Sequence, residues 1–427
     1  MEEGEERKVR VGLLGFGTIG SSVYGLIEKE RPAILEATGV DLRVSRILDI
    51  DTSKWGVDAP ASLFTADFND VVGDEEIDIV VELIGGIDRA FEFVSESLRR
   101  GKEVVTANKQ LIANRGAALF DLAREEGRQL RFEASVGGAI PVIRVMREGM
   151  IAAGLHSVYG IVNGTTNYIL TAMYEGEGGY ADTLARAQEL GYAEADPSAD
   201  VGGGDAAAKM AILASIAYRS RVTMADVTYE GIVDVTLEDV RYAKDFGFVI
   251  KLVGAARLID GKISVRVHPA LVPRDHLLAS INGSINAVYL QGHAIGEIML
   301  TGPGAGGDPT ATAVVGDVMT IAGTQAAGFL QNCSCYKHLE FLSDDLVESA
   351  FFIRMQVEDR AGVLAQISSV FGERQVSIES MIQKGQGDRA ELVFITYPSL
   401  EKDFFRAIET IAGFACVRSR PMTIRVL

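Results

Sequence analysis

The chain has 427 residues, 48% hydrophobic and 23% charged, a composition typical of a globular protein with more than one domain. Its 59 acidic and 41 basic side chains give a net charge of −18, which argues against binding to the phosphate backbone of nucleic acids. No apolar run reaches the roughly 20 residues of a membrane span. The N-terminal stretch MEEGEERK shows no secretory signal, so we expect a cytoplasmic protein.

The first 140 residues alternate between strand and helix patterns. Residues 8–20, KVRVGLLGFGTIG, predict a buried strand and a glycine turn, followed by a helix through about Lys29. Further strands are expected at 41–51, 77–86 and 101–109, with helices at 88–100 and 110–127. This alternation predicts βαβ crossovers and a doubly wound, Rossmann-type parallel sheet over residues 1–140.

Residues 141–330 have a mixed pattern that predicts an α+β domain for substrate binding and dimerisation. Its expected elements are strands near 155–162 and 263–271 and helices near 181–190, 205–219 and 309–323. The last helix follows the turn TGPGAGGDP, and the segment 301–330 is expected to return to the nucleotide-binding domain. Residues 331–350 are expected to be a linker.

The last 77 residues, 351–427, restart as an independent unit. Their order of strands and helices is βαββαβ, which is the ferredoxin-like arrangement. The predicted fold class is therefore α/β, with three domains of different architecture.

The glycine turn has the spacing and context of a dinucleotide-binding site. Gly15 permits a tight turn, Gly17 lets a pyrophosphate approach the backbone, and Gly20 lets helix and sheet pack closely. Asp49, at the tip of the second strand, would bind a ribose 2′-hydroxyl and favour NAD, whereas Arg46 and Lys54 would favour NADP. We expect NAD or NADP, with a preference for NAD, and a site formed by Gly15, Gly17, Thr18, Ile19, Gly20, Asp49, Gly85, Lys109 and Gly306.

A second motif, GYAEADPSADVGGGDAAAK, spans residues 191–209 and places four acids ahead of one lysine. Asp205 opens a helix and Lys209 follows at i+4 on the same face. Such a pair is often a solvated surface pair. The alanines and apolar residues around Lys209 instead predict a poorly solvated lysine that is able to carry a proton.

The same motif resembles the signature of the homoserine dehydrogenase family at every characteristic position. Further matches occur in order, at GFGTIG, TANK (106–109), EASVGGAIPVI (133–143), GIVNGTTNYIL (160–170) and TGPGAG…PTA (301–311). The departures are an extra acid, Asp308, and a region 46–54 that does not match the NADP-preferring pattern cleanly.

The resemblance implies reversible hydride transfer between L-homoserine and L-aspartate 4-semialdehyde in threonine, methionine and isoleucine biosynthesis. It implies that Lys209 is the acid/base and that Lys109 lies between coenzyme and substrate, with Asp205 as a further catalytic group. Homoserine is expected to contact Glu194, Asp200, Asp205, Asn163, Gly164, Thr165 and Thr166. A monovalent cation, Na⁺ or K⁺, is implied at the backbone carbonyls of Glu133, Val136, Gly138 and Ile140.

The stretch EDRAGVLAQISSVFGER resembles the ACT domain, an amino-acid-sensing module. Asp359, Gly362 and Leu364 would form its effector turn, and threonine is the effector that the family resemblance implies. Such modules commonly pair, so a homodimer or homotetramer is expected. A pairing domain without a ligand is the alternative.

Other functions are less consistent with the sequence. Aspartate-semialdehyde dehydrogenase needs a catalytic cysteine, whereas all three cysteines lie beyond residue 330. A non-catalytic amino-acid sensor would be expected to lack Lys209 or Asp205. The chain length argues against an aspartokinase fusion. Cys333, Cys335 and His338 form at most an incomplete soft-metal site, and three cysteines are too few for a disulfide framework.

Overall fold

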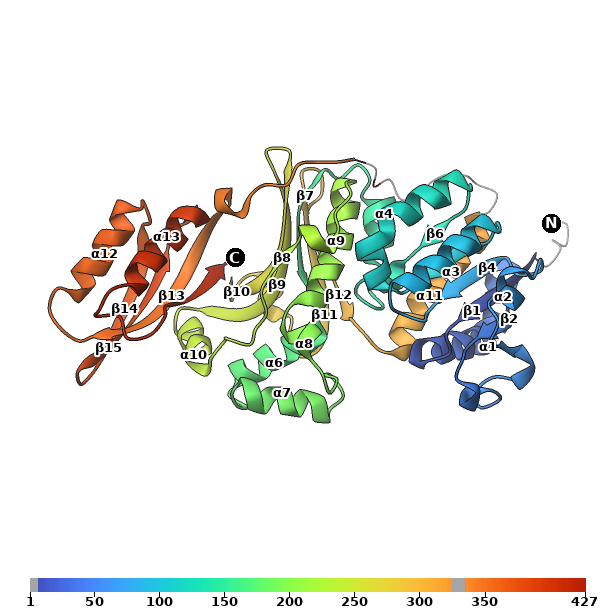
Figure 1. Cartoon of the computed structure of the whole chain (residues 1–427), viewed down its shortest axis with the longest axis horizontal. Helices are drawn as coiled ribbons and strands as arrows, with labels where there is room; N and C mark the ends of the chain where they lie inside the picture. Colours follow the sequence, from blue (N-terminus) through green and yellow to red (C-terminus); the bar gives the residue numbers. More distant parts are fainter. Residues whose placement is uncertain (1–6, 325–334, 336) are drawn as a thin grey trace. The chain divides into compact units, whose positions relative to one another are not determined.

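The computed structural model describes residues 7–324, 335 and 337–427 (Figure 1). The chain divides into two compact units. Unit 1 comprises the described parts of Met1–Val158, Ala207–Val227 and Ile285–His338, and unit 2 comprises Tyr159–Ala206, Thr228–Ser284 and Leu339–Leu427. The chain passes between them within β7 (Leu155–Ile161) and α9 (Gly204–Tyr218), among other places.

Unit 1 contains a parallel sheet of six strands in the order β3-β2-β1-β4-β5-β6. This order reverses direction next to β1, which confirms the doubly wound, Rossmann-type sheet. The strands are β1 (Arg7–Leu14), β2 (Val40–Leu48), β3 (Phe64–Thr65), β4 (Ile79–Glu82), β5 (Glu103–Thr106) and β6 (Leu130–Arg131). The helices between them are α1 (Thr18–Thr38), α2 (Asn69–Val72), α3 (Asp88–Arg99) and α4 (Lys109–Glu125).

A late helix, α11 (Gly307–Thr324), completes the core of this sheet. Its Ala311, Val314 and Val318 are buried in one cluster with Val11 and Leu13 of β1. Before it come two strands, β11 (Ile285–Gly292) and β12 (Gly296–Pro303), which form an antiparallel hairpin. The sequence pattern predicts no strand there, and it predicts a turn where β12 ends.

Helix α1 is longer than predicted. It continues past Lys29 and past Pro32 to Thr38, and it ends at Gly39 in a left-handed conformation, with φ +71°. The Gly39 N–H donates to the carbonyl of Leu35. The helix therefore stops where glycine makes the left-handed cap possible.

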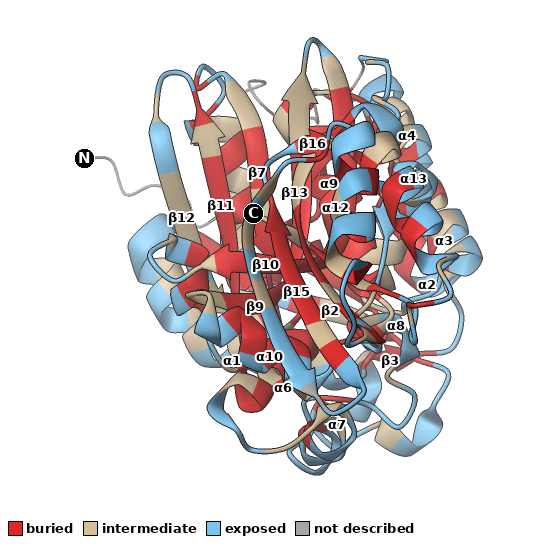
Figure 2. Ribbon diagram, turned by 90° about the vertical axis from the view of Figure 1, so that its left-hand side faces the viewer, coloured by how far each residue is buried: buried red, intermediate tan, exposed pale blue. Residues whose placement is uncertain are grey.

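Unit 2 contains an antiparallel hairpin, β9 (Phe248–Ile259) and β10 (Lys262–Pro273), and the C-terminal ferredoxin-like unit. The latter has the strand order β17-β13-β15-β14, in which its fourth strand lies beside the first and its third beside the second. Helices α12 (Val363–Glu373) and α13 (Glu401–Ala412) bury one face against this sheet and expose the other (Figure 2). The predicted βαββαβ arrangement is confirmed.

The remaining elements of the C-terminal unit are strands. They are β13 (Glu348–Glu358), β14 (Ile378–Gln386), β15 (Arg389–Thr396), β16 (Ser399–Leu400) and β17 (Met422–Val426). Outside the C-terminal unit, unit 2 also holds α6 (Gly164–Glu175), α7 (Tyr180–Glu189), α8 (Ser198–Val201), β8 (Thr228–Tyr229) and α10 (Leu237–Asp245).

The C-terminal unit is not independent of the residues before it. β17 pairs in parallel with β10, with Ala270 opposite Arg425, so one sheet continues from β9 and β10 into the ferredoxin-like unit. Part of the segment expected to be a linker is also hydrogen-bonded to β10, because Leu342 donates its N–H to the carbonyl of Ile263. The sequence pattern contained no signal for this pairing, since sequence periodicity does not identify which strand lies at an edge. No helix among the described residues is long and apolar enough to cross a membrane.

Candidate active site

Each glycine of the turn between β1 and α1 has its own geometric role. Gly15 has φ +100°, a conformation that L side chains rarely adopt. A side chain on Gly20 would meet the Gly15 carbonyl at 2.2 Å, so this position needs glycine for close packing. Gly17 faces open space within 4 Å, which leaves room for a ligand at the start of α1.

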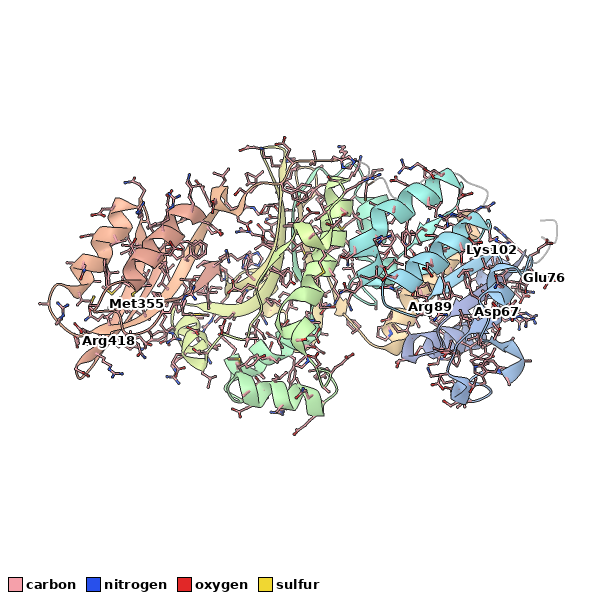
Figure 3. The ribbon with its side chains drawn as sticks, in the orientation of Figure 1. Asp67, Glu76, Arg89, Lys102, Met355 and Arg418 are labelled. Carbon is pink, nitrogen blue, oxygen red and sulfur yellow. The ribbon has the colours of Figure 1, made fainter. Side chains whose placement is uncertain are left out.

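An open cavity of about 410 Å³ lies above this turn. Predicted cofactor residues Gly15, Gly17, Asp49 and Gly85 line it, together with Lys54. Arg89, labelled in Figure 3, is a further lining residue, and no sequence motif predicts it. Arg46, which was considered as a phosphate ligand, is not among the lining residues; its guanidinium reaches the carbonyl of Ser62.

The Asp49 carboxylate is partly engaged by the backbone. It accepts the N–H of Phe16 at 2.7 Å and that of Asp51 at 2.8 Å, and the Lys54 ammonium lies 3.5 Å from it. Asp49 therefore holds the glycine turn against the end of β2. The cavity carries both an acid and two basic side chains, Lys54 and Arg89.

A buried acid, Glu82, is hydrogen-bonded to the first residue of the TANK motif. Its carboxylate accepts the N–H groups of Ile84 and Gly85 and the hydroxyl of Thr106 at 2.5 Å. Burial raises the pKa of Glu82 above its usual value, and these bonds act in the opposite direction. Asn108 caps α4 by accepting the N–H of Leu111, which places Lys109 at the first helical position.

The turn after β12 returns to the glycine turn. A side chain on Gly307 would meet the hydroxyl of Ser22 at 2.5 Å and lie 3.5 Å from atoms of Thr18, so the two segments are in contact. Gly306, a predicted cofactor residue, precedes this contact with φ +124°. The structure thus brings the residue after Gly306 next to Thr18, and Ile19 follows in α1.

In unit 2, the predicted substrate residues meet at the start of α6. Asn163 caps this helix, and its amide donates to Asp200 at 2.7 Å and to Asp205 at 2.9 Å. Thr165 donates to the carbonyl of Tyr192 and lies 3.3 Å from the carboxylate of Asp200. The structure therefore gathers two of the acids around one amide.

Other predicted substrate residues occupy different positions. The hydroxyl of Thr166 turns back to Asn163, and Gly164 is pressed against the carbonyl of Ser284, 2.8 Å from where a side chain would begin. Glu194 is exposed to solvent, and Asp196 serves as a local cap by accepting the N–H of Ser198.

Asp205 and Lys209 lie one turn apart on α9, as predicted. Their side chains are 5% and 9% exposed, which confirms the expected poor solvation of Lys209 and rules out a solvated surface pair. The preceding glycines allow close packing, because a side chain on Gly203 would meet the carbonyl of Glu230 at 2.9 Å.

The loop predicted to bind a monovalent cation is buried. Glu133, Val136 and Ile140 are at most 3% exposed. The carbonyls of Glu133 and Ile140 each accept one backbone N–H, and a carbonyl has two lone pairs. Gly138, with φ +56°, lies against Pro303 and Gly304. Backbone carbonyl oxygens are ligands of the type that suits Na⁺ or K⁺, and the residues that would supply them here are buried.

The side chain of Glu133 has a separate structural role. It accepts the N–H groups of Ile143 and Arg144, and its own N–H donates to the buried carboxylate of Asp317. Burial and the neighbouring Asp317 charge raise the pKa of Glu133 to about 7.

The predicted effector residues line one cavity of about 300 Å³ in the C-terminal unit. Asp359, Gly362 and Leu364 all contribute to it, and Gln383 of β14 lines it as well. Gly362 caps α12 with φ +92°, and a side chain there would meet no atom within 4 Å. Backbone groups at this helix start therefore face the cavity.

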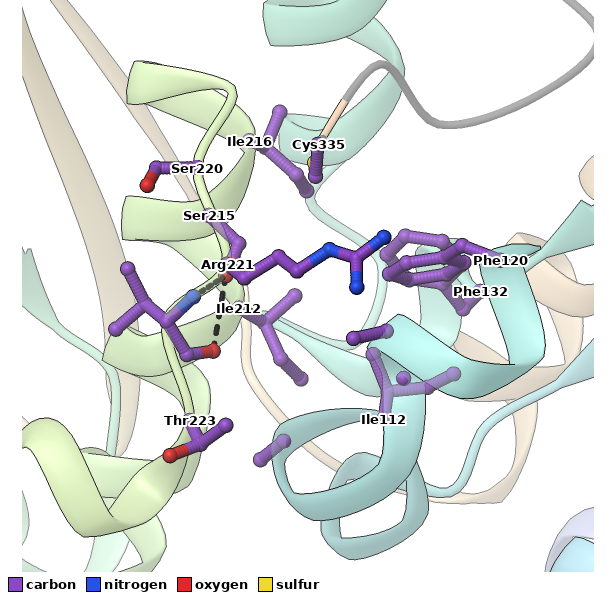
Figure 4. Close-up of a pocket in the computed structure, with 14 residues that line it drawn as sticks. Ile112, Phe120, Phe132, Ile212, Ser215, Ile216, Ser220, Arg221, Thr223 and Cys335 are labelled. Atoms are coloured by element: carbon purple, nitrogen blue, oxygen red, sulfur yellow. Dashed lines mark hydrogen bonds between the residues drawn. The ribbon is translucent and has the colours of Figure 1, made fainter. Parts of the chain in front are cut away.

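A smaller cavity, of about 20 Å³, lies between α4 and α9 in unit 1 (Figure 4). Phe120 and Phe132 form one wall, and the guanidinium of Arg221 points along it and pairs with Asp121 at 2.6 Å. This volume holds roughly one water molecule, so the cavity is a packing gap.

The cysteine cluster has no metal-binding geometry within the described residues. Cys333 lies outside them, and Cys335 is buried. In the part of the chain that the structure covers, no group of three or more His, Cys, Asp or Glu side chains is placed to hold a metal ion.

Comparisons with known proteins cover most of the chain. Family models match for homoserine dehydrogenase (residues 141–319), the NAD-binding domain of homoserine dehydrogenase (15–133) and the ACT domain (351–414). The homoserine dehydrogenase of Corynebacterium glutamicum is 42% identical, over 99% of this chain and 97% of that protein.

Solved structures agree with these matches. A homoserine dehydrogenase from Thiobacillus denitrificans has a TM-score of 0.95 and 38% identity, covering 99% of both chains. A hyperthermophilic archaeal homoserine dehydrogenase in complex with NADPH has a TM-score of 0.63 and 29% identity, over 74% of this chain and 98% of that one. The chain therefore belongs to the homoserine dehydrogenase family, as an oxidoreductase with an NAD-binding domain and an ACT domain.

Proposed function

We propose that this protein oxidises L-homoserine reversibly to L-aspartate 4-semialdehyde, in the route to threonine, methionine and isoleucine, with Lys209 as acid and base. The observation that carries the proposal is the gathering of Asp200 and Asp205 around the Asn163 amide, one helical turn before the buried Lys209. The two carboxylates attract the substrate ammonium. NAD(P)⁺, when bound, accepts the hydride.

The proton steps follow from the residue types. In the oxidation, Lys209 takes the hydroxyl proton as the hydride leaves the carbon that bears this hydroxyl, and in the reduction it returns that proton to the aldehyde oxygen. Asp205 and Asp200 hold the ammonium end, so the reacting carbon is presented in one orientation. Lys109, at the start of α4, lies between coenzyme and substrate in this proposal.

Lys209→Ala tests this assignment. We expect turnover to fall by at least about 100-fold with the fold retained, because the change removes a proton carrier and no large packing group. Initial rates with homoserine and either coenzyme measure it. Lys29→Ala, at a lysine whose side chain is 78% exposed on α1, is the matched control. Near-normal turnover of the Lys209 variant would contradict the proposal.

The coenzyme and the cation belong to the same proposal. Asp49 suits the 2′-hydroxyl of NAD, whereas Lys54 and Arg89 suit the 2′-phosphate of NADP, so both coenzymes are expected to be accepted. The NADPH complex of the archaeal relative supports binding of NADP.

The backbone carbonyls of the Glu133–Ile140 loop would hold Na⁺ or K⁺, which would stiffen that loop.

The regulatory part of the proposal concerns the ACT domain. The 300 Å³ cavity at Gly362 is proposed to bind threonine, with backbone groups of the turn holding its ammonium and carboxylate. Pairing of ACT domains between copies of the chain would make the protein a homodimer or homotetramer.

A further inference from the structure

Lys251 is a buried cation for which the proposed reaction has no use. Its side chain lies within β9 and the residue is 2% exposed. Its ammonium contacts four uncharged oxygens, namely the Ile281 carbonyl at 2.6 Å, Asn167 Oδ1 at 3.0 Å, Asn282 Oδ1 at 3.1 Å and Thr171 Oγ1 at 3.4 Å. Burying a charge is costly unless such bonds compensate for it.

These contacts join two segments of unit 2. Asn167 and Thr171 lie one turn apart on α6, whereas Ile281 and Asn282 belong to the loop after β10. The segments also bond directly, because Asn167 donates to the Ile281 carbonyl at 3.1 Å and the Gly283 N–H donates to Thr171 at 3.2 Å. Lys251 therefore lies at the centre of the contact between α6 and the loop of residues 281–284.

This contact between α6 and the loop extends to the proposed substrate residues through the first turn of α6. The loop ends at Ser284, whose carbonyl lies against Gly164 at the start of that helix. The residue before Gly164 is Asn163, whose amide holds Asp200 and Asp205. A shift of the loop or of α6 would therefore move the amide that orients both carboxylates.

We propose that Lys251 is a positioning residue for homoserine binding: it fixes α6 against the 281–284 loop so that Asn163 holds Asp200 and Asp205 in place. The inference rests on the proposed function, in which these carboxylates bind the substrate ammonium.

The charge on Lys251 contributes to this role. An ammonium offers three donors to the surrounding oxygens, whereas a neutral amine offers two and turns a lone pair towards one of them. Burial lowers the pKa of Lys251 to about 8, and Glu175, the last residue of α6, acts in the opposite direction. The KM for homoserine is therefore expected to rise above about pH 8.

Lys251→Met in the full chain is the test. We expect the KM for homoserine to rise about tenfold, while the KM for the coenzyme stays the same and kcat changes by less than about threefold. The alkaline rise in KM for homoserine should disappear in this variant. Lys262→Met, at a half-exposed lysine on the adjacent strand, should leave all three constants unchanged.

A second variant covers the case in which Lys251→Met does not fold. Asn282 is exposed, so Asn282→Ala removes one of the four oxygens and is expected to leave the fold intact and raise the KM for homoserine by about threefold. An unchanged KM in this variant, or an equal rise in KM for homoserine and for the coenzyme, would overturn the inference. Absence of homoserine turnover in the unmodified chain would overturn the proposed function, and this inference with it.

Discussion

Asp49 shows how one side chain combines a structural and a binding role. Its two bonds to the backbone hold the glycine turn, and it lines the same cavity as Lys54 and Arg89. A 2′-hydroxyl would gain a hydrogen bond to the carboxylate, whereas a 2′-phosphate would be repelled by it and attracted by the two cations. The balance between these charges decides the coenzyme preference.

Lys54→Ala should shift that balance towards NAD. We expect kcat/KM for NADP to fall by about tenfold and that for NAD to change by less than about twofold, because the removed charge attracts only the 2′-phosphate. Initial rates with each coenzyme at a saturating homoserine concentration provide both values. Equal losses for the two coenzymes would show that Lys54 acts through Asp49 and the turn.

At the scale of residues, the motifs could be predicted from the sequence, but most of the residues that surround and position them could not. Asp205 and Lys209 were found because a family signature and an alanine-rich helix coincide there. Glu82 and Arg89 gave no signal, because the end of β4 and the start of α3 reach the site only in the folded protein. Lys251 did leave a trace, since it is a single charge inside the apolar run FVIKLVGAA.

At the scale of elements, the start of α12 has a backbone conformation that limits substitution. Gly362 is left-handed, with φ +92°, and its neighbourhood is open. Alanine there would meet no clash and would carry only the conformational cost, which is about 1 kcal/mol. A substitution at this position therefore alters the turn without disturbing the core of the ACT domain.

Gly362→Ala should weaken threonine binding and leave activity without threonine unchanged. The strained turn is expected to move the backbone groups that face the cavity, and a methyl group would enter the space for the ligand. Calorimetric titration with threonine and its inhibition curve measure the effect. Matching affinities in the two proteins would place the effector elsewhere.

Elements were predictable from sequence where burial is complete or alternates regularly. The strands β1, β2, β4 and β5 consist mainly of buried residues and were recognised, as was the order of elements in the ACT domain. The hairpin of β11 and β12 was missed, because β12 is largely half-buried or exposed and ends within a glycine-rich turn. The end of α1 was missed because Pro32 does not break it.

At the largest scale, an ion network ties the ACT domain to the rest of unit 2. Glu401, at the start of α13, receives two bonds of 2.9 Å from Arg425 of β17 and one of 2.5 Å from Arg266 of β10. Ser349 donates a further bond. Burial alone would raise the pKa of Glu401, but the bonds and charges of Arg425 and Arg266 lower it to about 2.

Glu401→Gln should lower stability at neutral pH and flatten its acid dependence. A carboxyl with a pKa of about 2 in the folded state and 4.5 in the unfolded state stabilises the fold above pH 4.5. That stability, about 3 kcal/mol, is lost as pH falls from 4.5 to about 2. Denaturant unfolding at several pH values measures it, with Glu409→Gln on the same helix as control. Parallel pH curves for wild type and variant would contradict the assignment.

The ion network around Glu401 also approaches the segment that carries Asp200 and Asp205. Arg425 lies 3.7 Å from the carboxylate of Glu230, and the next residue, Gly231, packs against the backbone of Val201 and Gly202. Deleting residues 345–427 would therefore strip a strand from β10 and leave Arg266 buried without its carboxylate. A truncated protein is expected to lose stability, so the Gly362 variant is the cleaner test of regulation.

The placement of β17 also sets an order of events during synthesis. Leu271 of β10 lies opposite Val426, and its carbonyl accepts the N–H of Leu427, so this edge stays open until more than a hundred further residues have been translated. Contacts this distant in sequence form slowly. The nascent chain is thus exposed to aggregation at that edge until β17 has been synthesised and has paired with β10, and chaperone binding there would protect it.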